Sequence, residues 1–175
     1  SYNNYKGEIN ISSVNKNTIY GIMTTGDAYN SYNSNGIIKL TRNTSDPNDD
    51  TGTGLTGMGA WTEGIKDNIS GINERQTADE NSFLYNAFGG TGLIHIESTR
   101  GDARGMAGYN VINAANGGTG TIEIIANDGD VYGLTNVGNG FFTANAYGNN
   151  STGNITITAK NNKKTVKGIG AIAGK

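Results

Sequence analysis

The sequence predicts an all-β fold of the β-solenoid type, in which a repeat of about 28–33 residues coils along one axis. Two observations support this prediction. Turn-forming residues are frequent: the 175 residues include 28 Gly and 26 Asn, whereas only 34% are apolar. In addition, one short pattern of glycine and isoleucine recurs along the chain. Such a composition is typical of disorder or of repetition, and the fixed spacing of the apolar residues favours repetition.

The recurring pattern is Gly-x-Ile-x-Ile or a close variant, with copies that open at Gly7, Gly36, Gly92, Gly120 and Gly153. Apolar and polar residues alternate in each copy, which is typical of a strand with one buried face. Stacked coils would place the buried residues in a ladder: Ile9, Ile11, Ile38, Leu40, Ile94, Ile96, Ile122, Ile124, Ile155 and Ile157. The opening glycines are 29, 56, 28 and 33 residues apart, so the long interval predicts one degenerate or replaced copy.

Two further elements follow each of these strands. The second is a Gly between larger residues: Tyr20-Gly21-Ile22, Thr56-Gly57-Met58, Arg104-Gly105-Met106, Tyr132-Gly133-Leu134 and Lys167-Gly168-Ile169. The third stands before the next strand: Asp27-Ala28-Tyr29-Asn30, Asn86-Ala87-Phe88, Asn113-Ala114-Ala115-Asn116 and Asn145-Ala146-Tyr147. Gly and Asn tolerate the positive φ of sharp corners, and Asn side chains can stack as ladders.

Residues 59–86 differ in composition, since charge is higher there and glycine is rarer. We consider two interpretations of this region. It is either a short helical or irregular insertion, which would carry Trp61, or a complete degenerate coil that includes Asn68 to Ile72.

Residues 1–175 are expected to form a single β-solenoid domain that is a segment of a longer chain. A stack of coils ends in open sheet edges, which can pair with another chain. Copies of the same chain are therefore one expected class of partner.

The motifs Gly-x-Ile-x-Ile, Tyr-Gly-[Ile/Leu/Met] and Asn-Ala-x-Asn make nearly the whole chain outside residues 59–86 similar to passenger regions of Gram-negative autotransporters and to adhesin-type repeat proteins. This resemblance implies a right-handed parallel β-helix. It also implies an extracellular location or a place on the outer-membrane surface of a bacterium. A structural or adhesive role follows from the same resemblance, with a host surface protein or a glycan as partner.

Composition argues against several other classes of protein. A net charge of -2 without a long basic run does not favour nucleic-acid binding. No apolar run approaches the roughly 20 residues of a membrane span, so no membrane insertion by this segment is expected. Cysteine is absent, which excludes thiolate metal sites. We expect no cofactor.

The triplet Arg100-Gly101-Asp102 directly follows a predicted strand, and an exposed triplet of this kind would favour integrin contact. An ordinary polar corner is the competing interpretation. Asp128 and Asp130 superficially suggest a calcium loop, but the glutamate of an EF-hand and the repeat of calcium β-rolls are absent, so a plain turn is favoured and no metal site is predicted.

An enzyme is not expected. His95 is the only histidine, and no convincing Gly-x-Ser-x-Gly nucleophile elbow accompanies it. The residues Glu97, Glu123, Asp102, Arg100 and Arg104 would need to converge across coils to act on a polysaccharide. The favoured function is therefore a structural or adhesive segment that displays loops for host or cell contact. The alternatives are a subunit of an extracellular filament and a carbohydrate-binding or carbohydrate-degrading β-helix.

Overall fold

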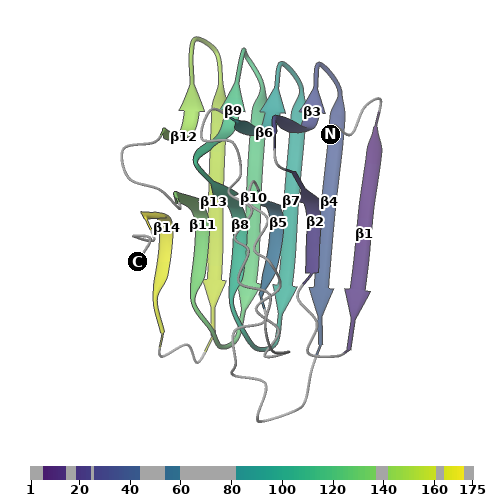
Figure 1. Cartoon of the computed structure of the whole chain (residues 1–175), viewed down its shortest axis with the longest axis vertical. Helices are drawn as coiled ribbons and strands as arrows, with labels where there is room; N and C mark the ends of the chain where they lie inside the picture. The colour runs from purple at the N-terminus through teal and green to yellow at the C-terminus, as the bar shows by residue number, and fades with distance from the viewer. Residues whose placement is uncertain are drawn as a thin grey trace, which may run out of the picture.

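The structure is a computed structural model, and it describes residues 6–14, 19–24, 26–43, 54–59, 82–136, 142–160 and 164–171. Within these ranges the chain is all-β and contains no helix. The strands form three parallel sheets around a shared core (Figure 1).

Each sheet takes every third strand of the chain. The first sheet contains β1 (Gly7–Ser13), β4 (Asn35–Arg42), β7 (Thr91–Ser98), β10 (Thr119–Ala126) and β13 (Thr152–Ala159). The second contains β2 (Ile19–Met23), β5 (Leu55–Gly59), β8 (Ala103–Gly108), β11 (Val131–Asn136) and β14 (Val166–Ala171). The third contains β3 (Ala28–Tyr32), β6 (Phe83–Phe88), β9 (Asn110–Ala115) and β12 (Thr143–Tyr147). One turn of the chain, hereafter a coil, thus contributes a strand to each sheet in the order first, second, third.

The register confirms the first predicted element. Gly7, Gly36, Gly92, Gly120 and Gly153 lie side by side across the first sheet. Because the strands alternate, the predicted isoleucine and leucine ladder lies on the inner face of this sheet. The members of the ladder in the middle coils are fully or almost fully buried, and those of β1 and β13 pack against the core while partly buried.

The prediction of a degenerate or replaced copy between Gly36 and Gly92 was wrong. β4 pairs directly with β7, with Ile38 beside Ile94 and Leu40 beside Ile96. The 56-residue interval therefore belongs to a single coil with a long connection, and the degenerate-coil interpretation fails. Residues 60–81 lie outside the described part, whereas Phe83 to Asn86 belong to β6 and are not helical. The interval is nearly two repeats long, which suggests a second coil. The pairing of β3 with β6 shows instead that the extra residues form an insertion between β5 and β6.

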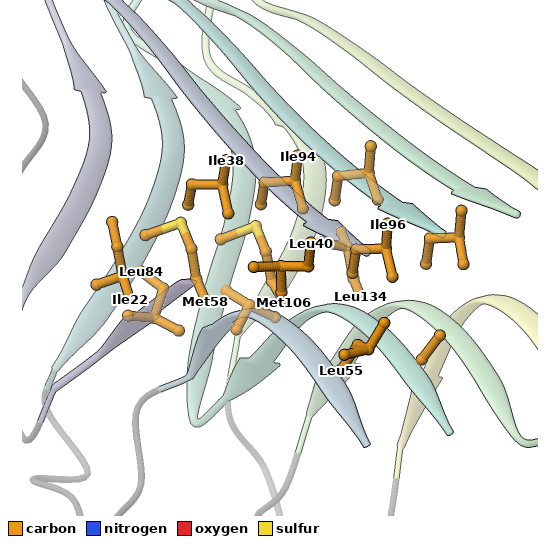
Figure 2. Packing of buried hydrophobic residues seen from close by; sticks show 14 of the residues in the cluster. Ile22, Ile38, Leu40, Leu55, Met58, Leu84, Ile94, Ile96, Met106 and Leu134 are labelled. Carbon is orange, nitrogen blue, oxygen red and sulfur yellow. The ribbon is translucent and has the colours of Figure 1, made fainter. Parts of the chain in front are cut away.

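The core is built by the inner faces of the three sheets. Figure 2 shows how the first sheet (Ile38, Leu40, Ile94, Ile96), the second (Met58, Met106, Leu134) and the third (Leu84) pack together. Val111 of the third sheet belongs to the same cluster. Full burial of one such side chain contributes roughly 1.5–3 kcal/mol. Because each coil holds only a few of these residues, the core exists only when coils stack.

The second predicted element is confirmed as the centre of the second sheet. Tyr20, Thr56, Arg104, Tyr132 and Lys167 align, as do the apolar residues two positions later. At Gly21, Gly57, Gly105 and Gly133 the glycine between them is required by the close approach of the next coil. A Cβ at Gly57 would lie 2.4 Å from Cγ2 of Ile94 and 2.6 Å from the carbonyl oxygen of Gly105, both in the next coil.

The third predicted element contains a ladder of asparagines, of which Asn30, Asn86 and Asn113 are buried and Asn145 is partly buried. The Nδ2 atoms of Asn30, Asn86 and Asn113 each donate to the Oδ1 of the next asparagine at 2.8 Å. All four Nδ2 atoms also donate to the carbonyl oxygen of the glycine that opens the next strand of the first sheet, at 2.8–3.1 Å. The first copy was misaligned in the sequence, because Ser31, not Ala28, pairs with Ala87. Corners beyond the ladder have positive φ at Asn33 and Asn116, as expected.

Candidate functional site

The outer face of the third sheet carries a cluster of aromatic side chains, which we call the aromatic surface. It consists of Tyr29, Tyr32, Phe83, Tyr85 and Phe88 on the neighbouring strands β3 and β6. Strand alternation sends Ala28 and Asn30 inward and Tyr29 outward. Tyr32 is 46% exposed, and the other four rings are half-buried.

The rings of the aromatic surface stack from one coil to the next. Tyr29 lies on Tyr85 with ring centroids 5.0 Å apart and planes 7° from parallel, and Tyr32 lies on Phe88 at 5.3 Å and 1°. Edge-to-face contacts join the two rows, with Tyr85 and Phe88 centroids 5.2 Å apart. Because adjacent strands are spaced about 4.8 Å apart along the stack, rings that stack along this direction point their edges and hydroxyls outward.

The hydroxyls of Tyr29 and Tyr85 remain protonated at neutral pH, because the pKa of each is raised. Burial raises the pKa of Tyr29, and the nearby Asp27 carboxylate raises it further. Burial also raises the pKa of Tyr85, with smaller contributions from Tyr29 and Asp27. Both hydroxyls can therefore donate hydrogen bonds to a ligand at neutral pH.

The aromatic surface ends at β9, and a hydrogen bond joins its two strands. In the next strand, Ile112 and Ala115 replace Tyr85 and Phe88, so the stacking does not continue into β9. Oδ1 of Asp27 accepts a hydrogen bond from the backbone N–H of Phe83 at 2.7 Å, which ties the two aromatic strands together at their start. The surface is thus local to two coils and held in register by the backbone.

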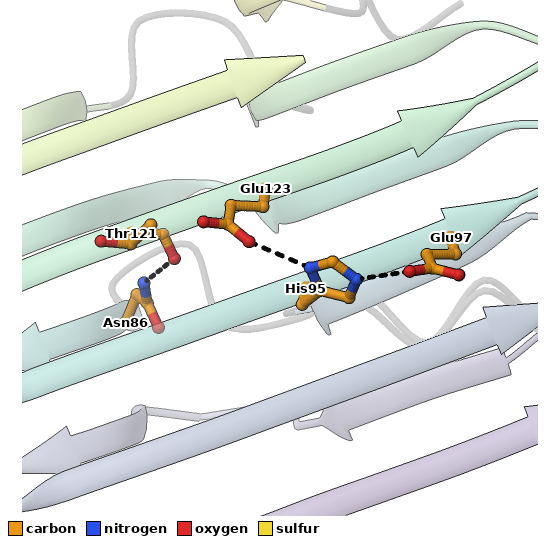
Figure 3. A network of polar contacts seen from close by, with 5 residues as sticks. All are labelled: Asn86, His95, Glu97, Thr121 and Glu123. Carbon is orange, nitrogen blue, oxygen red and sulfur yellow. Dashed lines mark hydrogen bonds and ion pairs between the residues drawn. The ribbon is translucent and has the colours of Figure 1, made fainter. Parts of the chain in front are cut away.

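The outer face of the first sheet carries a polar cluster centred on His95. Its Nδ1 lies 3.0 Å from Oε2 of Glu123 and its Nε2 lies 2.9 Å from Oε1 of Glu97 (Figure 3). Burial alone would lower the pKa of His95, but hydrogen bonds and charge from the two carboxylates outweigh it, and the net pKa is raised. Both ring nitrogens face acceptors, so the imidazolium form fits this position.

A shallow groove of about 480 Å³ lies beside this cluster on the same face. It is lined by residues aligned across three strands: Asn35, Gly36, Ile37, Thr91, Gly92, Leu93, Thr119, Thr121 and Glu123. Among the described residues of the lining, Glu123 alone is charged, and it already contacts His95.

The predicted triplet Arg100-Gly101-Asp102 lies at the corner between β7 and β8. The carbonyl oxygen of Arg100 accepts hydrogen bonds from the buried Arg42 guanidinium and from Oγ of Ser98. Gly101 is buried with φ of +82°. One oxygen of Asp102 accepts from the backbone N–H of Asp130 at 3.0 Å and the other contacts Arg104 at 3.3 Å. This geometry gives Asp102 a structural task, and integrin contact stays a prediction.

Asp130 makes the equivalent hydrogen bond one coil later. Its Oδ1 accepts a hydrogen bond from the backbone N–H of Thr165 at 2.9 Å. Asp128 stands two residues earlier on the same corner. Across the described ranges, no group of three or more His, Asp or Glu side chains is arranged to hold a metal ion.

Of the carboxylates considered for polysaccharide chemistry, the structure brings Glu97 and Glu123 to His95. Asp102 and Arg104 instead pair with each other at the second sheet. In the part of the chain that the structure describes, no helix has the length and apolar character needed to cross a membrane.

Sequence reasoning did not identify the aromatic surface. The signal was present as Tyr29 and Tyr32 in one copy and Tyr85 and Phe88 in another, with the same three-residue spacing. It becomes visible only when Tyr29 is aligned with Tyr85 across 56 residues.

Comparison with known proteins finds no relative: no family model, curated protein or solved structure matches the chain.

Proposed function

We propose that this chain is a right-handed β-solenoid segment of a secreted or surface-exposed bacterial protein, and that it acts as a rigid, non-enzymatic adhesive element. The aromatic surface is its contact face, and a glycan on a host or neighbouring cell is its ligand. The single observation that carries this proposal is the contiguous group of outward aromatic rings on β3 and β6.

The three parallel sheets support the mechanical part of this proposal. Every described strand is parallel to its neighbours, and the asparagine ladder joins the successive coils through buried hydrogen bonds. A stack held at every coil bends little, so a contact face on one side keeps a fixed position. Such a rod works by spacing and display rather than by chemistry.

The chemistry of the aromatic surface supports the adhesive part. Contiguous exposed aromatic groups mark interaction sites, because rigid rings bury much area at little entropic cost. The outward edges of the rings carry hydroxyl donors from Tyr29 and Tyr85. A polysaccharide offers both apolar C–H groups and many oxygen acceptors, so it matches a surface of ring edges and hydroxyls. A spacing near 5 Å between successive rings suits an extended chain.

The test is binding of the purified, fluorescently labelled chain to an array of defined bacterial and mammalian oligosaccharides. The combined variant Tyr29→Ala, Tyr85→Ala and Phe88→Ala should weaken binding about tenfold or more, since buried aromatic contacts dominate such interfaces. Retention of wild-type binding by a folded triple variant would refute the assignment of this surface. The absence of binding to every oligosaccharide on the array would refute the glycan as ligand.

Tyr132→Ala is the matched control, because it removes one outward tyrosine from the second sheet and leaves the aromatic surface intact. It should bind like wild type. Tyr85→Phe separates the two contributions of the surface, since it keeps the ring and removes the hydroxyl. Weaker binding by this variant shows that the hydroxyl donates to the ligand, whereas equal binding assigns the interaction to the rings.

A further inference from the structure

Tyr29 and Tyr85 form a pair of a kind that occurs once among the residues that the structure describes. They are Cα partners on the parallel strands β3 and β6. The other strand tyrosines have different neighbours: Tyr20 lies beside Thr56, Tyr32 beside Phe88, Tyr132 between Arg104 and Lys167, and Tyr147 beside Ala115. In the described part of the stack, the register therefore places one phenol directly beside another at a single point.

The two rings of this pair face each other and are held in place by their strands. Their centroids lie 5.0 Å apart and their planes are 7° from parallel. Two hydrogen bonds join the strands on either side of the pair, from the backbone N–H of Phe83 to Oδ1 of Asp27 and from Nδ2 of Asn30 to Oδ1 of Asn86. Both rings are half-buried, so part of each remains in contact with solvent.

Two tyrosines in this arrangement are suited to oxidative coupling. Removal of one electron and the hydroxyl proton turns a tyrosine into a phenoxyl radical, whose unpaired electron is shared by the oxygen and the ortho and para ring carbons. The orbital that holds this electron extends above and below the ring plane, so two such radicals join through their faces. The stacked rings present faces to each other. Tyr32 instead meets Tyr29 edge to face, at 86°, and presents C–H bonds.

We propose that Tyr29 and Tyr85 form an intramolecular dityrosine cross-link when a haem peroxidase and hydrogen peroxide act on the folded chain. Each phenol loses one electron and one proton, and the two radicals join by a bond between one ortho carbon of each ring. The hydrogen displaced from each ortho carbon moves to the oxygen of the same ring, which restores both phenols. The chain loses two hydrogen atoms in total, and one hydrogen peroxide is reduced to two waters.

The cross-link ties together the two coils on either side of the insertion between β5 and β6. It closes a loop of 56 residues, from β3 to β6. A covalent link of this kind restricts the unfolded chain, as a disulfide does. The chain contains no cysteine, so a disulfide cannot provide this tie. The inference does not rest on the adhesive proposal.

The test is treatment of the dilute, purified chain with a haem peroxidase and limiting hydrogen peroxide. The monomer is then isolated under denaturing conditions, which removes chains coupled to one another. It should show dityrosine fluorescence, a mass lower by two hydrogen atoms, and a proteolytic fragment that joins the segments of Tyr29 and Tyr85. After refolding, its midpoint of thermal unfolding should lie roughly 8–16 °C above that of the untreated chain, as expected for a closed loop of this length.

Three variants and an unfolded control separate this pair from other tyrosines. Tyr85→Phe keeps the stacked ring and removes the hydroxyl, so the yield of the intramolecular product should fall at least tenfold. Tyr132→Phe, the matched control on the second sheet, should cross-link like wild type. Tyr32→Phe removes the edge-to-face neighbour and should also cross-link like wild type. In concentrated urea the preference for Tyr29 and Tyr85 should disappear, because the fold no longer holds the rings together.

Three results would overturn the inference. The first is a folded wild-type monomer without dityrosine under conditions that couple free tyrosine. The second is a dominant link between Tyr29 and Tyr32, and the third is a product that persists in Tyr85→Phe. A cross-linked chain that unfolds at the same temperature as the untreated chain would refute the stabilising role of the link.

Discussion

Nδ2 of Asn86 donates to Oδ1 of Asn113 at 2.8 Å, and both side chains are completely buried. Each of these amides also donates to two backbone carbonyl oxygens of later coils; for Asn113 these belong to Gly120 and Asn154. A buried polar ladder of this kind is stabilising only while every group has its partner.

Replacement of a central asparagine should therefore destabilise the chain strongly. Asn113→Ala removes the acceptor of Asn86 and the donor to Gly120, and it leaves buried polar groups without partners. We expect the free energy of unfolding in urea to fall by about 3 kcal/mol or more. Asn10→Ala, an exposed asparagine on β1, is the control and should change it by less than about 0.5 kcal/mol. Equal effects of the two substitutions would show that the ladder adds nothing to stability.

The glycines of the second sheet should not tolerate alanine where another coil lies over them. Gly105→Ala places a Cβ 2.5 Å from the carbonyl oxygen of Gly133 and from Cγ2 of Ile122, so the coils must separate locally. The midpoint of thermal unfolding should fall by roughly 4–8 °C, as expected for overpacking of about 2 kcal/mol. Gly168→Ala is the matched control with open space around it. Thermal unfolding of both variants, followed by circular dichroism at a concentration that keeps the chain monomeric, measures the two midpoints.

His95 should titrate above its ordinary value of 6.5, since Glu97 and Glu123 favour the imidazolium. As the only histidine, it gives one resolved imidazole signal in an NMR titration. Because the pKa is raised in the folded state, the contribution to stability is complete below pH 6.5 and is lost as pH rises through the folded pKa. The contribution is below about 1 kcal/mol, since both carboxylates are about half exposed.

Removal of one carboxylate provides the control for this titration. Glu123→Gln keeps a hydrogen-bond acceptor near Nδ1 but removes a negative charge, so the pKa of His95 should fall relative to wild type. Lys39→Gln, which breaks the separate ion pair with Glu8 on the same face, should affect it much less. A titration that is unchanged in Glu123→Gln would contradict the assigned contact.

Asp102 should contribute to stability through its hydrogen bond with the backbone of Asp130 in the next coil. Asp102→Ala leaves the backbone N–H of Asp130 without its acceptor, and we expect unfolding in urea to become easier by about 1–2 kcal/mol. Asp128→Ala changes the same residue type on the neighbouring corner and should be close to neutral. A solid-phase assay with a purified integrin, run on wild type and Asp102→Ala, tests the contact that the triplet suggested. If Asp102 contributes nothing to stability, the two alanine variants will unfold alike.

Much of the first sheet could be predicted from the sequence because a strict two-residue alternation and an invariant Gly fix the register locally. Gly92 on Gly120 and Ile94 on Ile122 follow from the pattern. Gly36 on Gly92 did not follow, because the 56 residues between them suggested a further copy. The nature of that interval could not be predicted, because its length alone does not distinguish an insertion from an extra coil. The direct pairing of β4 with β7 shows that the interval contains an insertion and no extra coil.

The third sheet was harder to predict because its strands are short and share few residue types. Choosing Ala28 instead of Ser31 as the equivalent of Ala87 shifted the first copy and concealed the stacking of Tyr29 on Tyr85. The asparagine gives the correct register, since its side chain must reach both the next asparagine and the next strand-opening glycine. Aligning buried hydrogen-bonding residues before small apolar ones would have revealed the aromatic surface.

All the amides of the asparagine ladder point the same way along the rod, from Asn30 toward Asn145. Loss or duplication of one interior coil therefore keeps the direction of the ladder, because each coil presents the same asparagine and the same strand-opening glycine to its neighbours. Genes for such a rod can change its reach in steps of one repeat, about 28–33 codons, while the ladder keeps its pattern of hydrogen bonds.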